Sequence, residues 1–367
     1  MAVLVLNPGS ATLKASLIAL PGSTPRFERT LDWAGDGGDI RSRTIAAVLD
    51  AVRTLEPPIA IDAVGYRVVH GGSRFTTPAV LDDAAVAELA ELEDLAPLHN
   101  PVAVETIRAT RRALPEVAHV AVFDTAFHAT LPEAAWRYPV PSSWTDAGIR
   151  RYGFHGLSVA WSTARAAELL ERPSSDLCLV VAHLGGGCSV TAVDGGRSVD
   201  TSMGMTPLEG LMMGSRAGSI DPGIIFRLIR DGRDPSAIEA DLDRRSGLLG
   251  VGGTADMAEL LRREAADEGP ATLAIDMFVR RAAAAIAAAA TTLSRVDGVV
   301  FTGGIGEHAD PIVSRIARRL HLFGGAVSER LVGGDRVVLH VPGPPLLRIA
   351  AREDLVIARD VAATIGD

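Results

Sequence analysis

Lysine occurs once in this chain, at the end of the segment from Asn7 to Lys14 that follows the first apolar run. Every other basic side chain among the 36 lysines and arginines is arginine. A compact ammonium group reaches a single oxygen in a tight turn, whereas a guanidinium group needs a wider slot. With Gly9, Ser10 and Thr12 beside it, the segment has the small polar lining of a phosphate-binding loop. An ordinary hairpin whose lysine survived by chance is the alternative.

A second glycine turn, at residues 185–187, separates two apolar runs in the same way. Apolar runs joined by short glycine-containing turns predict β-hairpins. The predicted strands are 2–6 and 13–20 in the first hairpin, and 177–184 and 188–193 in the second.

Each predicted hairpin is matched by a distant strand that ends in small or acidic residues at the start of a helix. These strands are 120–123, before Asp124, and 299–301, before Thr302. Asn7 and Asp124 are 117 positions apart, and His183 and Thr302 are 119 positions apart. The similar spacings predict a duplicated α/β unit, with two phosphate-facing hairpins opposed across a cleft.

The segments between these strands have apolar residues three and four positions apart, which predicts helices. The predicted helices are 41–55, 84–95, 102–114, 225–230, 257–268, 271–293, 311–320 and 355–365. The longest apolar block, Ala282 to Ala290, is too short to span a bilayer and predicts a buried helix.

The length of 367 residues and the apolar content of 47% predict about two domains with separate cores. We expect one domain from 1–126 plus 354–367 and a second from 127–353. The net charge of -9, with scattered acidic residues, argues against a nucleic-acid-binding surface. The two cysteines, Cys178 and Cys188, provide no disulfide framework, which favours a cytoplasmic location. We expect both to be small core residues. The first residues predict a strand and no signal peptide or membrane anchor.

Several segments, in order along the chain, closely resemble the acetate kinase family, which is related to sugar kinases, actin and heat-shock chaperone ATPases. They are residues 4–17, 64–72, 97–101, 123–128, 151–156, 183–187, 200–216, 220–222 and 301–307. The resemblance implies a duplicated, actin-like and sugar-kinase-like α/β fold, with two domains around a nucleotide cleft. It also implies a homodimer.

The reaction implied by this resemblance is reversible in-line transfer of the γ-phosphoryl group of ATP to acetate, which gives acetyl phosphate and ADP. Mg²⁺ is the implied cofactor, and Mn²⁺ can substitute for it. Because a carboxylate is already a nucleophile at pH 7, catalysis needs mostly positioning and charge stabilisation.

By resemblance, Arg67 holds the acceptor carboxylate, Arg216 holds the transferring phosphoryl group, and His155 donates to that group. The forked guanidinium suits both arginine roles because it binds two oxygens at once. Surface ion pairs are the alternative for the arginines, and a core position is the alternative for His155. The implied catalytic set is Arg67, Asp124, His155 and Arg216, supported by His99 and His183.

The resemblance also assigns residues to the metal and to both substrates. Asp124 and Glu353, with Asn7, match the hard oxygen ligands of Mg²⁺, although Asp124 could instead cap a helix. The implied acetate pocket contains Arg67, Val69, Leu98, Phe154 and Pro207. The implied nucleotide site contains Lys14, His183, Leu184, Gly185, Gly186, Gly187, Asp256, Gly303, Gly304, Ile305 and Gly306.

Departures from the family pattern lie mostly on the nucleotide side. Gly186, Ala258 and His308 stand where the family usually has Asn, Arg and Asn. Tyr66, Val159, Cys188 and the pair Ala351-Arg352 also differ from the usual residues. They leave open a different phosphoryl donor, such as pyrophosphate, or a longer acceptor, such as propionate. The same fold also serves in ATPase switches that bind proteins.

Overall fold

The computed structural model describes residues 1–9, 12–33, 38–97, 99–320, 325–332, 335–341 and 343–366. The chain divides into two compact units, Met1–Ala129 with Arg352–Asp367, and Thr130–Ala351. These junctions lie a few residues from the boundaries expected from the sequence.

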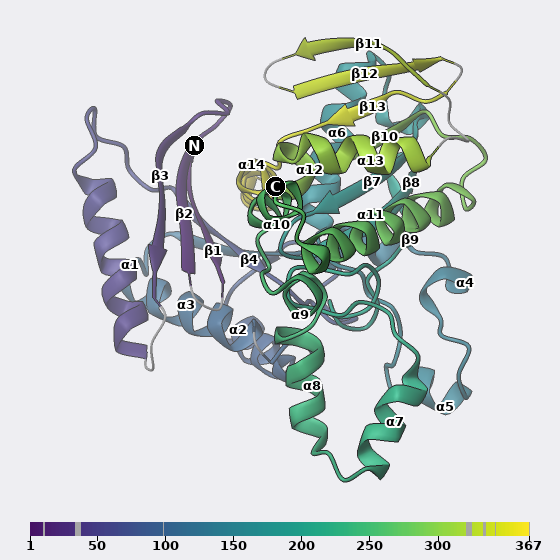
Figure 1. Cartoon of the computed structure of the whole chain (residues 1–367). Helices are drawn as coiled ribbons and strands as arrows, with labels where there is room; N and C mark the ends of the chain where they lie inside the picture. Colours follow the sequence, from purple (N-terminus) through teal and green to yellow (C-terminus); the bar gives the residue numbers. More distant parts are fainter. Residues whose placement is uncertain are drawn as a thin grey trace. The chain divides into compact units, whose positions relative to one another are not determined.

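The first unit is built on a six-stranded sheet with the order β3-β2-β1-β4-β6-β5 (Figure 1, purple and blue). The neighbours β1, β4 and β6 are parallel, whereas the remaining pairs are antiparallel. The strands are β1 (Ala2–Pro8), β2 (Thr12–Ala19), β3 (Pro25–Asp32), β4 (Ala63–Val68), β5 (Ala79–Val80) and β6 (Ala118–Phe123). The carboxyl ends of β1, β4 and β6 therefore meet at one edge of the sheet.

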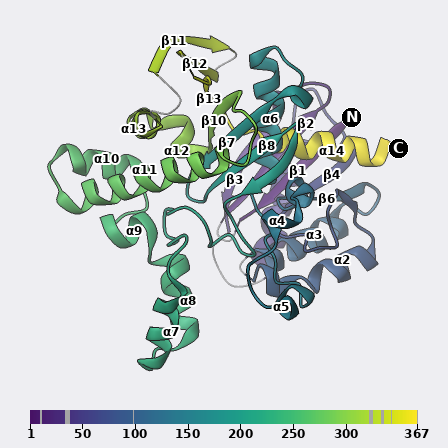
Figure 2. The same cartoon turned by 90° about the vertical axis from the view of Figure 1, so that its right-hand side faces the viewer.

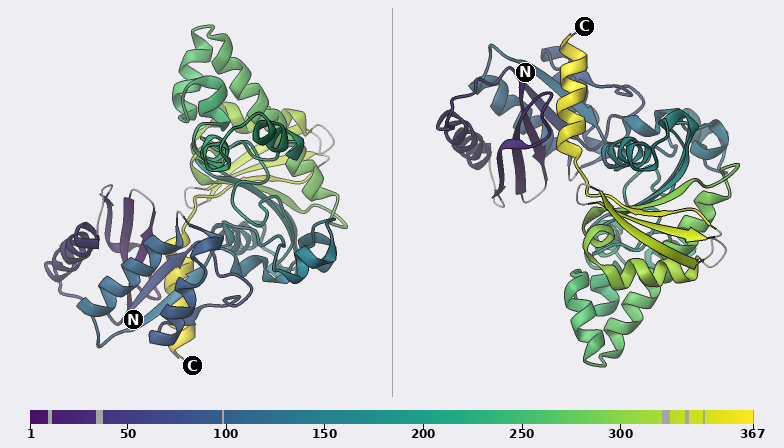
Figure 3. Two further views of the ribbon diagram at one scale, coloured as in Figure 1. Left: turned by 90° about the horizontal axis from the view of Figure 1, so that it is seen from below. Right: turned by 90° about the horizontal axis from the view of Figure 1, so that it is seen from above.

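Helices cover both faces of this sheet. One face packs with a core to which α1 (Gly38–Arg53), α2 (Asp83–Ala90) and α3 (Asn100–Ala113) contribute. The C-terminal helix α14 (Glu353–Gly366) packs on β1, β2, β4 and β6. Figure 3 shows α14 in yellow beside the purple strands. The short helices η1 (Glu93–Leu95) and η2 (Ala126–Thr130) complete the described helices of this unit.

Strand β4 shows how the alternation of side chains separates core from site. Tyr66 and Val68 point into the core, whereas Gly65 and Arg67 face the side of α14. A Cβ atom at Gly65 would stand 2.6 Å from a methyl carbon of Ile357. The glycine therefore lets α14 lie close to the sheet, with its first residues beside Arg67.

Helix α14 also carries a carboxyl group whose burial is not compensated. Burial raises the pKa of Asp360 to about 6, so the folded state disfavours its charged form. The contribution of protonated Asp360 to the unfolding free energy is fully present below its unfolded pKa of about 3.9, and it is lost as the pH rises through 6. We expect Asp360→Asn to raise the unfolding free energy at pH 7.5 by about 1 to 2 kcal/mol, with less gain at pH 4.5.

Urea unfolding at both pH values checks this prediction, with the exposed Asp94→Asn as the control. If Asp360→Asn does not raise the unfolding free energy, or raises it equally at the two pH values, burial of the Asp360 charge does not destabilise the fold.

The second unit contains a seven-stranded sheet with the order β11-β12-β13-β10-β7-β8-β9. Strands β7, β10 and β13 are parallel neighbours, and the other pairs are antiparallel. The bounds are β7 (Cys178–Leu184), β8 (Cys188–Asp194), β9 (Arg197–Thr201), β10 (Gly298–Thr302), β11 (Gly325–Val332), β12 (Asp335–Val341) and β13 (Leu346–Arg348). Both cysteines are buried and free, which confirms the expectation that they are core residues.

The helices of the second unit include α6 (Gly156–Leu170), which packs on β7 and β10, and α11 (Gly269–Ala290), which packs on β7 and β8. Figure 2 shows α7 and α8 extending away from the sheet. The others are α4 (Glu133–Trp136), α5 (Ser142–Asp146), η3 (Ser174–Asp176), α7 (Pro222–Arg230), α8 (Pro235–Arg244), α9 (Gly247–Gly252), α10 (Met257–Ala265), α12 (Gly303–His308) and α13 (Asp310–Arg319).

The strand orders confirm the predicted duplication but correct its alignment. The order β3-β2-β1-β4-β6 in the first unit corresponds to β9-β8-β7-β10-β13 in the second. Strand β10 is therefore the counterpart of β4, which carries Arg67, and not of β6, which precedes Asp124. The match of Asp124 with Thr302 was therefore wrong. The two similar sequence spacings include the helices and loops between the strands, so they do not show which strands are neighbours in each sheet.

Two helix predictions also need correction. The segment 84–95 is not one helix, because α2 ends at Ala90 and a separate 3₁₀ turn, η1, follows. The block from Ala282 to Ala290 is buried on one face only, since Ala284 and Ala288 are exposed. Helices α6 and α8 were not predicted. Within the described residues, every helix is too short or too polar to cross a membrane.

Candidate functional site

Arg67 is the centre of a charged network in the first unit. Its Nε donates to Asp124 Oδ1 at 3.0 Å, and its Nη2 donates to the other oxygen of the same carboxylate. Its Nη1 donates to Asn7 Oδ1 at 3.3 Å. Glu353 Oε2 lies 3.7 Å from Arg67 Nε and accepts from Asn7 Nδ2 at 3.5 Å. Four of the predicted site residues therefore converge here.

The sheet topology explains this convergence. Asn7 and Arg67 lie near the ends of β1 and β4, and Asp124 directly follows β6. Because these strands are parallel neighbours, their ends share one edge of the sheet. Glu353 is the first residue of α14, which packs against the same strands.

The network is strongly charged and largely removed from water. The Asp124 side chain is 1% exposed, and that of Arg67 is 17% exposed. Burial raises the pKa of Asp124, Arg67 lowers it and Glu353 raises it, with a net value of about 6. Burial lowers the pKa of Arg67, but the carboxylates of Asp124 and Glu353 outweigh this effect and leave it raised. The guanidinium and the Asp124 carboxylate are thus a buried ion pair.

The alternatives proposed for these residues are not found. The described side-chain hydrogen bonds of Asp124 go to Arg67, so the helix-capping role is not seen among the residues that the structure describes. Arg67 does not form a surface ion pair, since Asp124 is buried and the Arg67 side chain is only 17% exposed.

The same oxygens fit a magnesium ion. Mg²⁺ needs one or two carboxylates and keeps several waters, and each carboxylate oxygen can accept from more than one direction. Asp124, Glu353 and the amide of Asn7 supply such hard ligands, and burial, with a smaller effect of the Glu353 carboxylate, raises the pKa of Asp124 against the opposing effect of Arg67. No group of three or more His, Cys, Asp or Glu side chains with metal-binding geometry occurs in the described ranges.

The other predicted residues of the first unit differ in exposure. Lys14 pairs with Asn7 across β1 and β2, so both side chains share one face of the sheet. Lys14 is exposed, and two residues of the turn expected to surround its ammonium group, Ser10 and Ala11, lie outside the described residues. Val69 is buried, and His99 precedes α3. Leu98 lies outside the described residues.

The loop after β4 is held by two polar side chains, those of Asn100 and Thr125, for which no role was predicted. Asn100 is fully buried, accepts from the backbone of His70 at 3.2 Å, and donates to its carbonyl at 2.9 Å. Thr125 accepts from the backbone of Gly71 at 3.1 Å. These bonds fix the backbone next to Val69.

In the second unit, two histidine rings are stacked with their centroids 4.2 Å apart. His155 precedes α6 with the left-handed backbone angles φ 60° and ψ 22°, which cost energy for a non-glycine residue. Its Nδ1 lies 3.0 Å from Ser189 Oγ. His183, near the end of β7, has its Nδ1 2.8 Å from Ser158 Oγ. His155 is buried, but its position and strain differ from those of an ordinary core residue.

Arg216 lies beside the same rings. Its Nη1 donates to the carbonyl oxygen of Pro207 at 2.6 Å. Burial lowers its pKa, and the nearby carboxylate of Asp243 raises it. A Cβ atom at Gly187 would stand 2.9 Å from Arg216 Nη2 and 3.1 Å from His155 Nε2. The glycine turn therefore leaves the space in which the arginine and histidine nitrogens converge. Phe154 is buried.

This geometry predicts the effect of filling that space. In Gly187→Ala, the new methyl group has to displace the flexible end of Arg216, at little cost in stability, and it crowds the His155 ring. If both side chains act in the reaction, a displacement of this kind lowers kcat by about 10- to 100-fold.

Steady-state kinetics and urea unfolding check this expectation. Gly269→Ala at the start of α11 is the control, because nothing lies within 4 Å of a Cβ there and Gly269 is not among the predicted site residues. Equal kcat values for the two variants would show that the space at Gly187 does not matter.

A pocket of about 360 Å³ adjoins the glycine turn of the second unit. Five of the predicted nucleotide-binding residues line it: Gly185, Gly186, Asp256, Gly304 and Ile305. Its other walls include Ala258 and His308, two of the residues that depart from the family pattern. Asp256 also caps α10, since its Oδ1 accepts from the backbone of Ala258 at 2.8 Å.

The remaining predicted nucleotide residues follow the two strand ends. Leu184 is buried at the end of β7, and Gly303 and Gly306 are buried in α12. Glu307, which the sequence did not single out, accepts from the backbone of Gly303 at 2.9 Å and of Ala351 at 3.0 Å. It thereby fixes the glycine turn at the start of α12.

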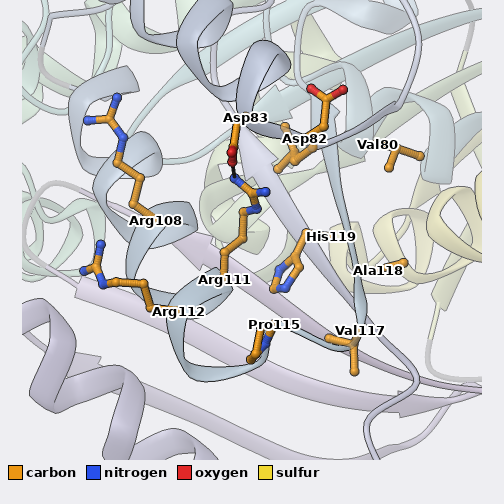
Figure 4. Close-up of a pocket in the computed structure, with 11 residues that line it drawn as sticks. Val80, Asp82, Asp83, Arg108, Arg111, Arg112, Pro115, Val117, Ala118 and His119 are labelled. Atoms are coloured by element: carbon orange, nitrogen blue, oxygen red, sulfur yellow. Dashed lines mark hydrogen bonds and ion pairs between the residues drawn. The ribbon is translucent and has the colours of Figure 1, made fainter.

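A larger pocket, of about 540 Å³, lies at the other end of β6 in the first unit. Figure 4 shows Arg111 paired with Asp83, with Arg108 and Arg112 nearby. None of the predicted site residues lines it. The carboxyl ends of the strands, and not this pocket, therefore mark the candidate site.

Comparisons with known proteins agree with this geometry. The sequence model of the Acetokinase family matches residues 38–359. An acetate kinase of Deinococcus radiodurans is 46% identical over 377 residues, covering 99% of this chain and 94% of the relative. The crystal structure of Porphyromonas gingivalis acetate kinase is 30% identical with a TM-score of 0.88, and the alignment covers 99% of both chains. A propionate kinase from Francisella tularensis subsp. tularensis SCHU S4 is 35% identical with a TM-score of 0.88 and 98% coverage of both chains. The predicted family and fold are confirmed, and the chain belongs to the acetokinase family.

Proposed function

We propose that this protein transfers the γ-phosphoryl group of ATP to acetate, reversibly giving acetyl phosphate and ADP. The observation that carries the proposal is the network of Arg67, Asp124, Glu353 and Asn7 at the carboxyl ends of parallel strands. A carboxylate oxygen of acetate attacks the γ-phosphorus as the bond to the β-phosphate oxygen breaks, and ADP leaves with that oxygen.

Arg67 is the proposed binding group for acetate. Of its five N–H groups, the contacts to Asp124 and Asn7 use three, which leaves one on each terminal nitrogen. Two such donors match the two oxygens of a carboxylate. Buried Val69, together with Phe154 and Pro207, is proposed to limit the space for the acyl chain.

Arg216 and His155 are the proposed donors to the phosphoryl group. Charge spreads over its equatorial oxygens during transfer, and fixed donors aimed at that charge lower the barrier. The convergence of Arg216 Nη2 and His155 Nε2 beside Gly187 supports this assignment. His99 and His183 are assigned supporting roles.

Asp124, Glu353 and Asn7 are proposed to hold Mg²⁺, for which Mn²⁺ can substitute. When bound, the ion supplies positive charge to the phosphate oxygens. Arg67 keeps Asp124 in place through two hydrogen bonds to its carboxylate.

The pocket beside Gly185 and Gly304 is proposed to hold the nucleoside of ATP. Ala258 offers no cation there, unlike the arginine usual in the family, so pyrophosphate or another nucleotide stays open as donor. Propionate stays open as acceptor, because one methylene changes discrimination by only about 1 to 3 kcal/mol.

Trapping of acyl phosphate by hydroxylamine tests the function. Purified protein with Mg²⁺ is assayed with acetate or propionate, and with ATP, GTP or pyrophosphate as donor. The proposal predicts acyl hydroxamate with acetate and ATP at the highest kcat/KM of these combinations. A lack of hydroxamate with ATP, or a preference for pyrophosphate or propionate, would replace the proposed substrates.

A homodimer in the cytoplasm completes the proposal. Helix α7 buries none of its residues within the chain, and Ile224, Phe226 and Ile229 are exposed by 47%, 60% and 42%. An apolar face of this kind suits contact with a second copy. We expect Phe226→Asp to convert a dimer into a monomer in light scattering, with Arg227→Asp as a control on the same helix. If the wild-type protein is a monomer, the proposed dimer is excluded. If the Phe226→Asp variant is still a dimer, α7 is excluded as the contact between the two copies.

A further inference from the structure

Two buried serines hold the stacked histidines in a crossed arrangement. Helix α6 supplies Ser158 and is directly preceded by His155, whereas the β7–β8 hairpin supplies His183 and Ser189. Each serine bonds the imidazole of the other element: Ser189 that of His155, and Ser158 that of His183. Both serines are fully buried. Neither was singled out by the sequence or assigned a role above.

The bonded atom is the same in both rings. Ser189 Oγ lies 3.0 Å from Nδ1 of His155, and Ser158 Oγ lies 2.8 Å from Nδ1 of His183. The opposite nitrogens face glycines, since His155 Nε2 would lie 3.1 Å from a Cβ at Gly187. His183 Nε2 would lie 3.1 Å from a Cβ at Gly303. The two Nε2 atoms are therefore directed at the two glycine turns of the candidate nucleotide site.

The surroundings favour neutral rings. Two imidazolium cations with centroids 4.2 Å apart would repel one another in a buried place, and the guanidinium of Arg216 adds a third positive charge nearby. A neutral histidine carries one N–H, and the bond at its other nitrogen decides where that proton lies. A serine hydroxyl that donates to Nδ1 leaves the proton on Nε2.

We propose that Ser189 and Ser158 are positioning residues that donate to Nδ1 of His155 and His183 and so hold each neutral ring as an Nε2–H donor. Each N–H then points at a glycine turn, where it can donate to a phosphate oxygen. The role of these donors rests on the proposed function. The protonation state itself does not.

Nitrogen-15 NMR of the histidine side chains in the whole protein at pH 7.5 tests the protonation state without any assay of activity. His155→Gln and His183→Gln variants assign the two signals. The proposal predicts a proton on Nε2 and none on Nδ1 in both wild-type rings. A proton on Nδ1 of either ring would overturn the proposal for that ring, whether or not the protein phosphorylates acetate.

Kinetics test what the positioning does. We expect Ser189→Ala to lower kcat by about tenfold or more with a smaller change in KM, because the ring of His155 loses its orienting bond. Ser189→Thr, which keeps the hydroxyl, should recover part of the loss. Thr191→Val is the matched control, because Thr191 is a fully buried hydroxyl on β8 that bonds Thr201 and no histidine.

The outcomes separate this inference from the proposed function. Wild-type kcat in Ser189→Ala, or an equal loss in Thr191→Val, would overturn the positioning role while acetate phosphorylation stands. Failure of the wild type to make acetyl phosphate would overturn the function, and the NMR result would still decide the protonation state.

Discussion

Replacement of Arg216 by alanine is expected to lower kcat by about 10²- to 10³-fold, the usual cost of removing one donor to developing charge. The guanidinium is held by the carbonyl of Pro207 and faces the space beside Gly187, so its loss removes a fixed donor. The fold should change little, because the removed group takes part in one described hydrogen bond. Arg216→Lys should recover only part of the rate, since an ammonium group lacks the fork.

Steady-state kinetics and urea unfolding of purified variants measure both effects. Arg262→Ala is the control, because the Arg262 side chain is 72% exposed on α10. If folded Arg216→Ala keeps more than about a tenth of wild-type kcat, equivalent to about 1.4 kcal/mol, Arg216 is not a donor to the transition state.

Arg67→Ala is expected to lose both activity and stability. The substitution removes the proposed acetate-binding fork, so the rate should fall by a factor similar to that for Arg216→Ala. It also leaves the Asp124 carboxylate buried without its partner. Breaking a buried ion pair in this way costs about 3 to 5 kcal/mol of unfolding free energy.

A double-mutant cycle separates the two losses. With a chelator present, urea unfolding should show that Arg67→Ala with Asp124→Asn is more stable than Arg67→Ala alone, because the second substitution removes the unpaired charge. Activity should stay low in the double variant. A single variant as stable as the wild type would contradict the buried ion pair.

The strand ends of the first unit could be predicted from the sequence in part. Apolar runs indicated the strands before Asn7 and Asp124, and the polar residues at their ends indicated a site. Glu353 came only from the family resemblance, because nothing local shows that a helix far along the chain returns to β1 and β4. The close approach at Gly65 that permits this packing is a tertiary contact with Ile357.

Other features could not be predicted because they depend on contacts between distant elements. Ser158 and Ser189 are ordinary hydroxyls in the sequence, and only the packing of α6 against β7 brings them to the histidines. Asn100 was part of a matched segment, but its bonds to the loop after β4 depend on the fold.

Isotope transfer from acetate tests the central claim most directly. Wild-type protein is incubated with ATP, Mg²⁺ and acetate labelled with ¹⁸O in both carboxylate oxygens, and the acetyl phosphate is examined by ³¹P NMR. If the acetate oxygen attacks the γ-phosphorus, the bridging oxygen of the product carries the label and shifts its phosphorus signal. Acetyl phosphate without ¹⁸O in the bridge, or no acetyl phosphate at all, would contradict direct transfer to acetate.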